Sequence, residues 1–158
     1  MKYVALTLLL AVSALMSCTG STAAFRNLDR SVDQAKQEWL FVQTAEKAEA
    51  TSETTLVMLS RRDIFAFTDR PYRKYGYMTI EKFASLWDED GTFKEDPPNA
   101  VLTWVSTEDM KESEIILKGA EWHSDGRVTY SFTVAAGDGP EDSMKLPSLF
   151  VDGAARIL

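Results

Sequence analysis

Residues Ile64–Val105 read IFAFTDRPYRKYGYMTIEKFASLWDEDGTFKEDPPNAVLTWV, and this stretch decides the fold. Its centre predicts a short helix from about 80 to 90. Thr79 is a good N-cap for such a helix, and Gly91 can supply the left-handed residue that ends it. Four residues repeat at the spacing i, i+3, i+4 and i+7 that gives a helix one apolar face: Ile80, Phe83, Ala84 and Trp87.

Apolar runs on both sides of this helix predict strands. The predicted ranges are about 38–45, 54–59, 64–67, 100–105, 113–122, 128–134 and 146–151. The charged residues 46–53 are expected to form a loop, and Gly119 to mark a bulge. Asp125-Gly126 between two strand patterns indicates a type I′ hairpin turn. The sequence therefore predicts a mainly β fold, an antiparallel sandwich of about seven strands with one inserted helix, or alternatively a small closed barrel.

Length and composition limit the class of protein. A chain of 158 residues, 45% hydrophobic and 11% aromatic, is typical of one globular domain. The formal net charge of −7 argues against binding to a nucleic-acid backbone or to an anionic lipid surface, because both need clustered Lys and Arg. We therefore expect no nucleic-acid partner.

The N-terminus indicates export. Residues 1–17 have a positive start and an almost wholly apolar run that is too short to span a bilayer comfortably. Leu15-Met16-Ser17-Cys18 resembles a bacterial lipobox, which would make Cys18 a lipidated membrane anchor. Thr22-Ala23-Ala24 instead resembles a cleavage site that would release a free periplasmic or extracellular chain beginning near Phe25. Both interpretations remain open.

The expected organisation follows from these segments. Residues 1–17 are the export signal, 18–36 a tether, 37–153 a single β-rich domain and 154–158 a tail. Because Cys18 is the only cysteine, the mature domain is expected to contain no disulfide.

Several motifs in the deciding stretch resemble an uncharacterised family of small exported bacterial proteins. They are Phe67-Thr68-Asp69-Arg70-Pro71, Gly76-Tyr77-Met78-Thr79, Phe83 with Trp87-Asp88, and Asp96-Pro97-Pro98-Asn99-Ala100. The resemblance covers most of the chain after about Trp39 and implies export, but no activity, ligand or catalytic residue. The position of Tyr77 is often histidine in that family, so any histidine chemistry there is not expected in this chain.

One constellation is a candidate binding site. Its members are Asp69, Arg70, Tyr72, Tyr75, Tyr77, Trp87 and Asp88. Aromatic faces beside a charged pair are what sugar and peptide pockets use, because the polar groups fix the orientation of the ligand. The alternative is structural: the aromatic residues cover one edge of the sheet, and Arg70 pairs with Asp88 as an internal brace.

The acidic residues around Gly91 are a candidate calcium site. Asp88, Asp90 and Asp96 could supply carboxylate oxygens, although the EF-hand register fails because Leu86 and Pro97 occupy its first and last positions. No other cofactor is predicted.

Signs of catalysis are few. His123 is the only histidine, and no nucleophile motif accompanies it. Asp69 with Asp88 or Asp96 could form a carboxylate pair for glycoside hydrolysis, but nothing in the sequence fixes their spacing.

Three functional hypotheses follow. The leading one is a non-enzymatic envelope domain that binds a small ligand or an envelope protein. The second is a structural or accessory lipoprotein held to the membrane through Cys18. The third is a small calcium-dependent or carboxylate hydrolase.

Overall fold

Nine antiparallel strands form one continuous sheet in the computed structural model, which describes residues 38–60, 62–107 and 109–153. The strands are β1 (Trp39–Thr44), β2 (Lys47–Ser52), β3 (Thr55–Leu59), β4 (Ile64–Phe67), β5 (Tyr75–Met78), β6 (Asn99–Val105), β7 (Met110–Trp122), β8 (Arg127–Ala136) and β9 (Met144–Gly153). The predicted mainly β fold with a short helix is confirmed.

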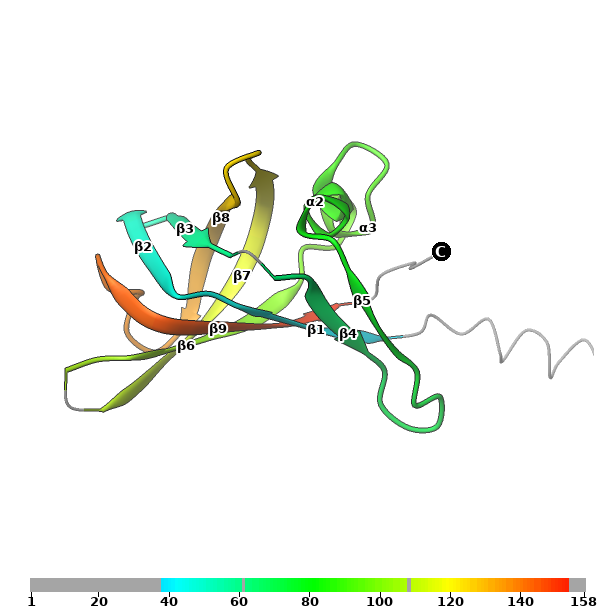
Figure 1. Cartoon of the computed structure of the whole chain (residues 1–158), viewed down its shortest axis with the longest axis horizontal. Coiled ribbons are helices and arrows are strands. Elements are labelled where there is room, and N and C mark those ends of the chain that lie inside the picture. Colours follow the sequence, from blue (N-terminus) through cyan, green and yellow to red (C-terminus); the bar gives the residue numbers. More distant parts are fainter. Residues whose placement is uncertain (1–37, 61, 108, 154–158) are drawn as a thin grey trace, which may run out of the picture. The chain divides into compact units, whose positions relative to one another are not determined.

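The order of the strands is β2-β3-β8-β7-β6-β9-β1-β4-β5, with a further pairing between β2 and β9. This pairing closes β2, β3, β8, β7, β6 and β9 into a ring, as in the barrel alternative (Figure 1). β1, β4 and β5 continue the sheet beyond that ring. β9 is shared, since it pairs with β6 along one side and with β1 and then β2 along the other.

Each predicted strand is present, and two more strands accompany them. β2 lies where a charged loop was expected, so that expectation is wrong. Its side chains are mostly polar and exposed, and Ala48 alone in the strand is fully buried. Its backbone is nevertheless paired with β3, the next strand along the chain, and with the distant β9, which cannot be read from a local pattern. β5 is a short strand around Gly76.

The helix is shorter than predicted. The α-helix α2 spans Ile80–Ala84 and continues as the 3-10 turn η1 (Ser85–Trp87), and a separate short helix, α3 (Thr92–Glu95), follows Gly91. Thr79 is the N-cap as predicted, and its Oγ1 accepts a hydrogen bond from Lys82 N at 3.2 Å. Gly91 does not end a helix in the left-handed conformation, because its φ is −78°. Glycine is needed there for space, since a Cβ atom would lie 2.2 Å from Leu86 O.

The helical segment packs its aromatic side chains into the core. Ring centroids of Trp87 lie 5.3 Å from Phe83 and 4.8 Å from Phe93, while Phe41 on β1 lies 5.2 Å from Phe83. The indole Nε1 of Trp87 donates to the carbonyl of Leu117 on β7 at 3.2 Å, which ties the segment to the ring.

The β7–β8 hairpin has the predicted position but a different turn. Gly126 has a φ of 89°, whereas Asp125 is not in the positive-φ region that a type I′ turn requires. Gly126 N donates to His123 O, and His123 N donates to Arg127 O. This is a three-residue hairpin loop with glycine in the left-handed position. The predicted bulge at Gly119 is confirmed by a register shift between Leu117 and Gly119.

Candidate functional site

The outer face of the sheet carries a row of apolar side chains that runs across five strands. In register, Tyr77 on β5 lies beside Phe65 on β4, Phe65 beside Val42 on β1, Val42 beside Phe150 on β9, and Phe150 beside Val101 on β6. At the usual strand spacing of nearly 5 Å, this row extends over roughly 19 Å.

A second row runs parallel to the first; it is apolar on three strands and polar on the next two. Tyr75, Phe67 and Leu40 lie side by side on β5, β4 and β1, and Asp152 and Asn99 follow on β9 and β6. We call the apolar members of both rows the aromatic face: Tyr75, Tyr77, Phe65, Phe67, Leu40, Val42, Phe150 and Val101.

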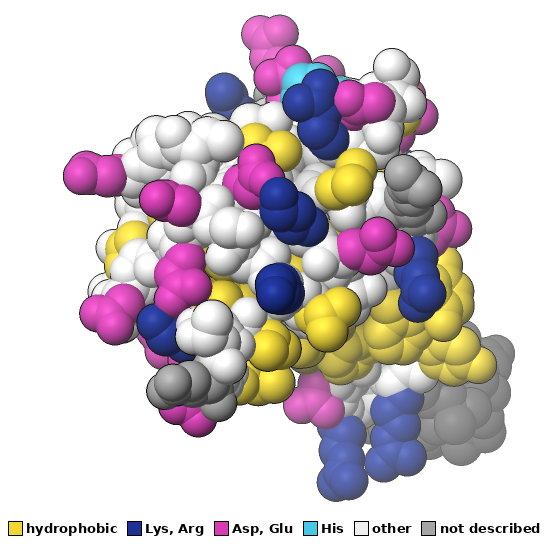
Figure 2. Space-filling model, turned by 60° about the vertical axis from the view of Figure 1, so that its left-hand side comes forward, with side chains coloured by type: hydrophobic (Ala, Val, Ile, Leu, Met, Phe, Trp, Pro, Cys, Tyr) yellow, Lys and Arg dark blue, Asp and Glu magenta, His cyan; other side chains and the backbone are white. Residues whose placement is uncertain are grey.

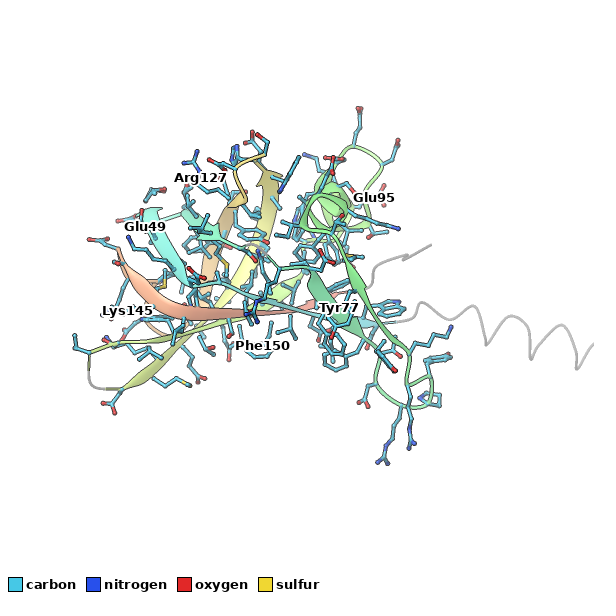
Figure 3. All side chains as sticks on the ribbon, in the orientation of Figure 1. Glu49, Tyr77, Glu95, Arg127, Lys145 and Phe150 are labelled. Atoms are coloured by element: carbon cyan, nitrogen blue, oxygen red, sulfur yellow. The ribbon has the colours of Figure 1, made fainter. Side chains whose placement is uncertain are left out.

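The aromatic face is accessible to solvent. Tyr75 is 77% exposed, Tyr77 71% and Phe150 44%. The rings also contact one another: the Phe65 centroid lies 5.3 Å from that of Tyr77 and 5.5 Å from that of Phe67. Figure 3 labels Tyr77 beside β4 and β5 and Phe150 beneath β9. Figure 2 shows hydrophobic side chains gathered along the lower part of the visible surface.

A groove lies at the β9 end of the aromatic face. Its volume is about 380 Å³, and Leu40, Val101 and Phe150 contribute apolar lining. Asn99, Glu114 and Asp152 add polar groups to the same groove. Apolar surface with a few polar groups is the usual composition of a ligand site, and this volume falls in the range of such sites.

The β4–β5 turn holds the predicted charged residues. Asp69 and Arg70 are exposed, Tyr72 is half-buried, and the Arg70–Pro71 peptide bond is cis. The Asp69 carboxylate accepts a hydrogen bond from the Arg70 backbone N–H at 2.6 Å. Among the described residues, no ion pair joins Arg70 to Asp88, so the internal brace is not present.

The predicted constellation is therefore divided between two places. Asp69, Arg70 and Tyr72 are in the turn next to Tyr75 and Tyr77, and these five belong together. Trp87 lies in the core at 5% exposure, with its indole N–H bonded to the backbone of β7. Asp88 is exposed at the end of η1.

The candidate calcium ligands do not converge in the described part of the chain. Asp88, Asp90 and Asp96 are all exposed around α3. Nowhere among residues 38–60, 62–107 and 109–153 do three or more His, Cys, Asp or Glu side chains come together in a way that could hold a metal ion.

His123, and a buried tyrosine that the sequence does not single out, both have structural partners. His123 is half-buried, and its Nε2 lies 3.0 Å from Thr129 Oγ1. In the core, the Tyr130 hydroxyl donates to Gln43 Oε1. Burial raises the pKa of Tyr130 far above its ordinary value of 10.0, so this hydroxyl remains protonated and acts as a donor.

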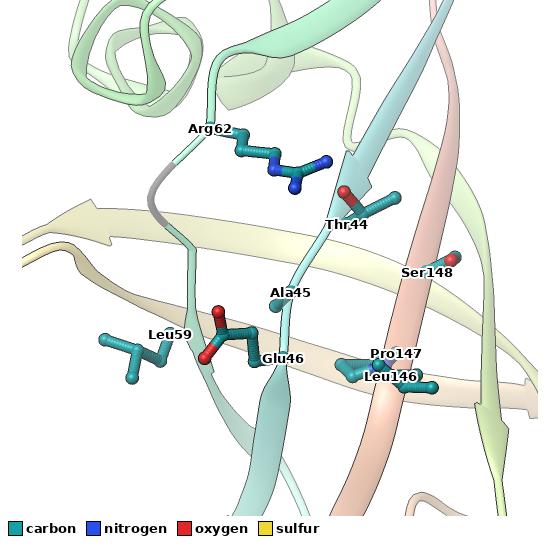
Figure 4. Close-up of a pocket in the computed structure, with 8 residues that line it drawn as sticks. All are labelled: Thr44, Ala45, Glu46, Leu59, Arg62, Leu146, Pro147 and Ser148. Atoms are coloured by element: carbon teal, nitrogen blue, oxygen red, sulfur yellow. The ribbon is translucent and has the colours of Figure 1, made fainter.

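A second hollow of about 370 Å³ lies where β1 passes into β2 and β3 into β4 (Figure 4). Its lining includes Thr44, Glu46, Arg62 and Pro147. Ser60 is buried nearby and donates its hydroxyl hydrogen to Thr44 O at 3.0 Å.

Cys18, the export signal, the tether and the tail lie outside the described residues. Within the described ranges, no helix has the length and apolar character needed to cross a membrane.

Compared with protein-family models, with curated proteins and with solved structures, the chain shows no significant match.

Proposed function

We propose that this chain is an exported, non-enzymatic domain of the cell envelope that binds a small ligand or a protein partner through the aromatic face. The observation that carries the proposal is the row from Tyr77 to Val101, in which neighbouring apolar side chains lie in register across five strands. A contiguous apolar surface on a soluble domain is typical of an interaction site.

The surroundings of the aromatic face define the chemistry of its ligand. The Tyr75 and Tyr77 rings offer broad apolar surfaces, which favour an aromatic, aliphatic or sugar-ring partner. At the other end, Glu114 and Asp152 place carboxylates beside the groove formed with Phe150. The best match is a partner with an apolar body that lies along the aromatic face. At the end of that body near Phe150 it would carry a cationic or hydrogen-bond-donating group, about one strand spacing further on.

A structural lipoprotein is the second candidate, and it rests on the position of Cys18. The only cysteine of the chain follows the apolar signal at the place where a lipobox ends. An anchor at Cys18 is compatible with binding through the aromatic face. Cys18→Ser is expected to move the protein from the membrane fraction to the soluble fraction, and unchanged fractionation would contradict the anchor.

Photo-crosslinking in intact cells tests the binding role. A photoreactive amino acid is placed at Tyr77, at Phe150, or at Glu49, an exposed control position on β2. We expect the first two positions to yield the same discrete adduct and Glu49 to yield none. In the Tyr77-labelled chain, Phe150→Ser should reduce that adduct.

Two results would contradict the proposal. One is the same adduct pattern from Glu49 as from the aromatic face. The other is no adduct from either position on the face while the protein is folded and exported.

A further inference from the structure

The free edge of β5 has backbone groups that no strand of the described sheet uses. β5 is the last strand in the order and is hydrogen-bonded to β4 alone. Thr68 N donates to Lys74 O at 2.9 Å, and Lys74 N donates to Thr68 Oγ1 at 2.9 Å. Hydrogen-bonded pairs alternate along an antiparallel ladder, so Gly76 faces β4 with its N–H and C=O, whereas Tyr75 and Tyr77 direct theirs outward.

Three common protections against a further strand are absent from β5 itself. Natural edges are blocked by proline, by lysine or by bulges, and Tyr75–Met78 contains neither residue and pairs with β4 without a register shift. Gly76 leaves open space, since a Cβ atom built there would meet nothing within 4 Å.

We propose that a second copy of this chain pairs with β5 in antiparallel orientation, with a two-fold axis at Gly76. The proposal concerns the edge of the sheet and goes beyond binding at the aromatic face. The sequence Tyr75-Gly76-Tyr77 is symmetric about its centre. Tyr75 of one copy then lies opposite Tyr77 of the other, and both exchange their outward N–H and C=O groups. An isologous contact of this kind is closed and forms a dimer.

The charges at the two ends of β5 favour the same arrangement. Arg70 and Arg73 are exposed before the strand and make no ion pair within the described ranges. Glu81 is exposed in the first turn of α2, after the strand. Antiparallel pairing brings the basic turn of each copy beside the Glu81 end of the other, whereas parallel pairing would place the two basic turns together.

The dimer would also enlarge the aromatic face. Tyr75 and Tyr77 point to the outer side, so pairing places four tyrosines in a continuous strip between the two copies. The row that begins at Val101 then continues through Tyr77 of one copy to Tyr75 of the second copy.

Disulfide trapping tests this geometry. Because Cys18 is the only cysteine, Cys18→Ser provides a cysteine-free background in the full chain. Gly76 and its copy would form a non-hydrogen-bonded pair with Cα atoms about 4.5 Å apart, which a disulfide can span. We expect Gly76→Cys to form a covalent dimer under mild oxidation, with a yield several-fold above that of Glu49→Cys.

A proline variant tests the backbone contact separately. The N–H of Tyr77 points away from β4, so Tyr77→Pro removes an outward donor without removing a bond to β4. Sedimentation of the purified protein should show the dimer dissociation constant rising by about tenfold or more for Tyr77→Pro, and by much less for Tyr77→Val, which keeps the N–H.

The outcomes separate the alternatives. Gly76→Cys yields no higher than those of Glu49→Cys would overturn the proposal, as would a protein that sediments as a monomer at every concentration. A disulfide from Gly76→Cys to a different protein would also overturn it, in favour of an extended segment from another chain. If Tyr77→Pro does not fold, the trapping result alone decides.

Discussion

The closed ring and the β1–β4–β5 extension belong to one sheet but differ in the polarity of the side chains that they present to water, as β8 and β4 show. On β8, in the ring, Val128, Tyr130 and Phe132 are buried, while the alternating residues are polar. On β4, in the extension, Ile64 and Ala66 are buried, yet the other face carries Phe65 and Phe67. An apolar second face on a strand with one side in solvent is the mark of a surface with a further role.

This difference indicates which residues stabilise the fold and which are available for binding. In the ring, apolar side chains meet inside a closed ladder, and the outer side of β8 is polar, while β9 and β6 next to the extension contribute Phe150 and Val101 to the aromatic face. In the extension, the inner face still contributes to the core through Phe41, but the outer face gathers aromatic rings that nothing in the described residues covers. Mutations in the two regions should therefore separate folding from recognition.

The largest expected effect is on the core. Trp87→Ala removes a buried indole packed on Phe83 and Phe93 and leaves the Leu117 carbonyl without its donor. We expect the free energy of unfolding to fall by about 3–5 kcal/mol, as measured by denaturant unfolding. Tyr77→Ala on the aromatic face is the matched comparison, with an expected loss below about 1 kcal/mol. Equal losses for the two variants would show that the extension also carries the stability of the fold.

An intermediate effect is expected for the buried polar pair inside the ring. Tyr130→Phe removes the hydroxyl that donates to Gln43 Oε1, and Gln43 Nε2 already has no partner among the described residues. The variant should lose about 1–3 kcal/mol, because the amide is then buried with neither group bonded. Adding Gln43→Leu should restore part of that loss, and a double-mutant cycle measures the coupling. A double variant that is less stable than Tyr130→Phe would contradict this account.

The smallest effect is the pH dependence of an ion pair on the surface of the ring. Lys111 Nζ lies 2.6 Å from Glu141 Oε1, and this hydrogen bond lowers the pKa of Glu141 below its ordinary value of 4.5. A lowered pKa stabilises the folded state above the unfolded pKa, and that contribution is lost as the pH falls through the folded value. The stability difference between the native chain and Glu141→Gln should therefore be small at pH 7 and shrink further below about pH 4.5. A difference that grows on acidification would contradict the pairing.

Local patterns were sufficient for most of the fold. Strict alternation predicts β8, the alternating run at Ala100 predicts β6, and Thr79 marks the start of α2. The sequence could not decide between sandwich and barrel, because closure depends on the short contact between β2 and β9. β2 itself has too few apolar residues for a periodic signal, and β9, its partner in closing the ring, lies far along the chain.

The candidate site was only partly accessible to sequence analysis. The sequence places Tyr75 and Tyr77 close to the charged turn, whereas Phe150 and Val101 join them only through strand register. Trp87 is near the turn in sequence, but the apolar spacing that predicts the helix also directs its indole to the core. A usable signal was present at Phe65 and Phe67, which make the second face of β4 apolar.

The pairing of β1 with β9 has a consequence for the order of folding. Trp39 lies opposite Gly153, so β1 can pair with the nearby β4 early but can pair with β9 only when nearly the whole described domain is available. Contacts between such distant residues slow folding, because the intervening chain must first be brought together. Under the export proposed above, this delay is useful: β1 cannot complete both of its ladders before β9 has followed it across the membrane.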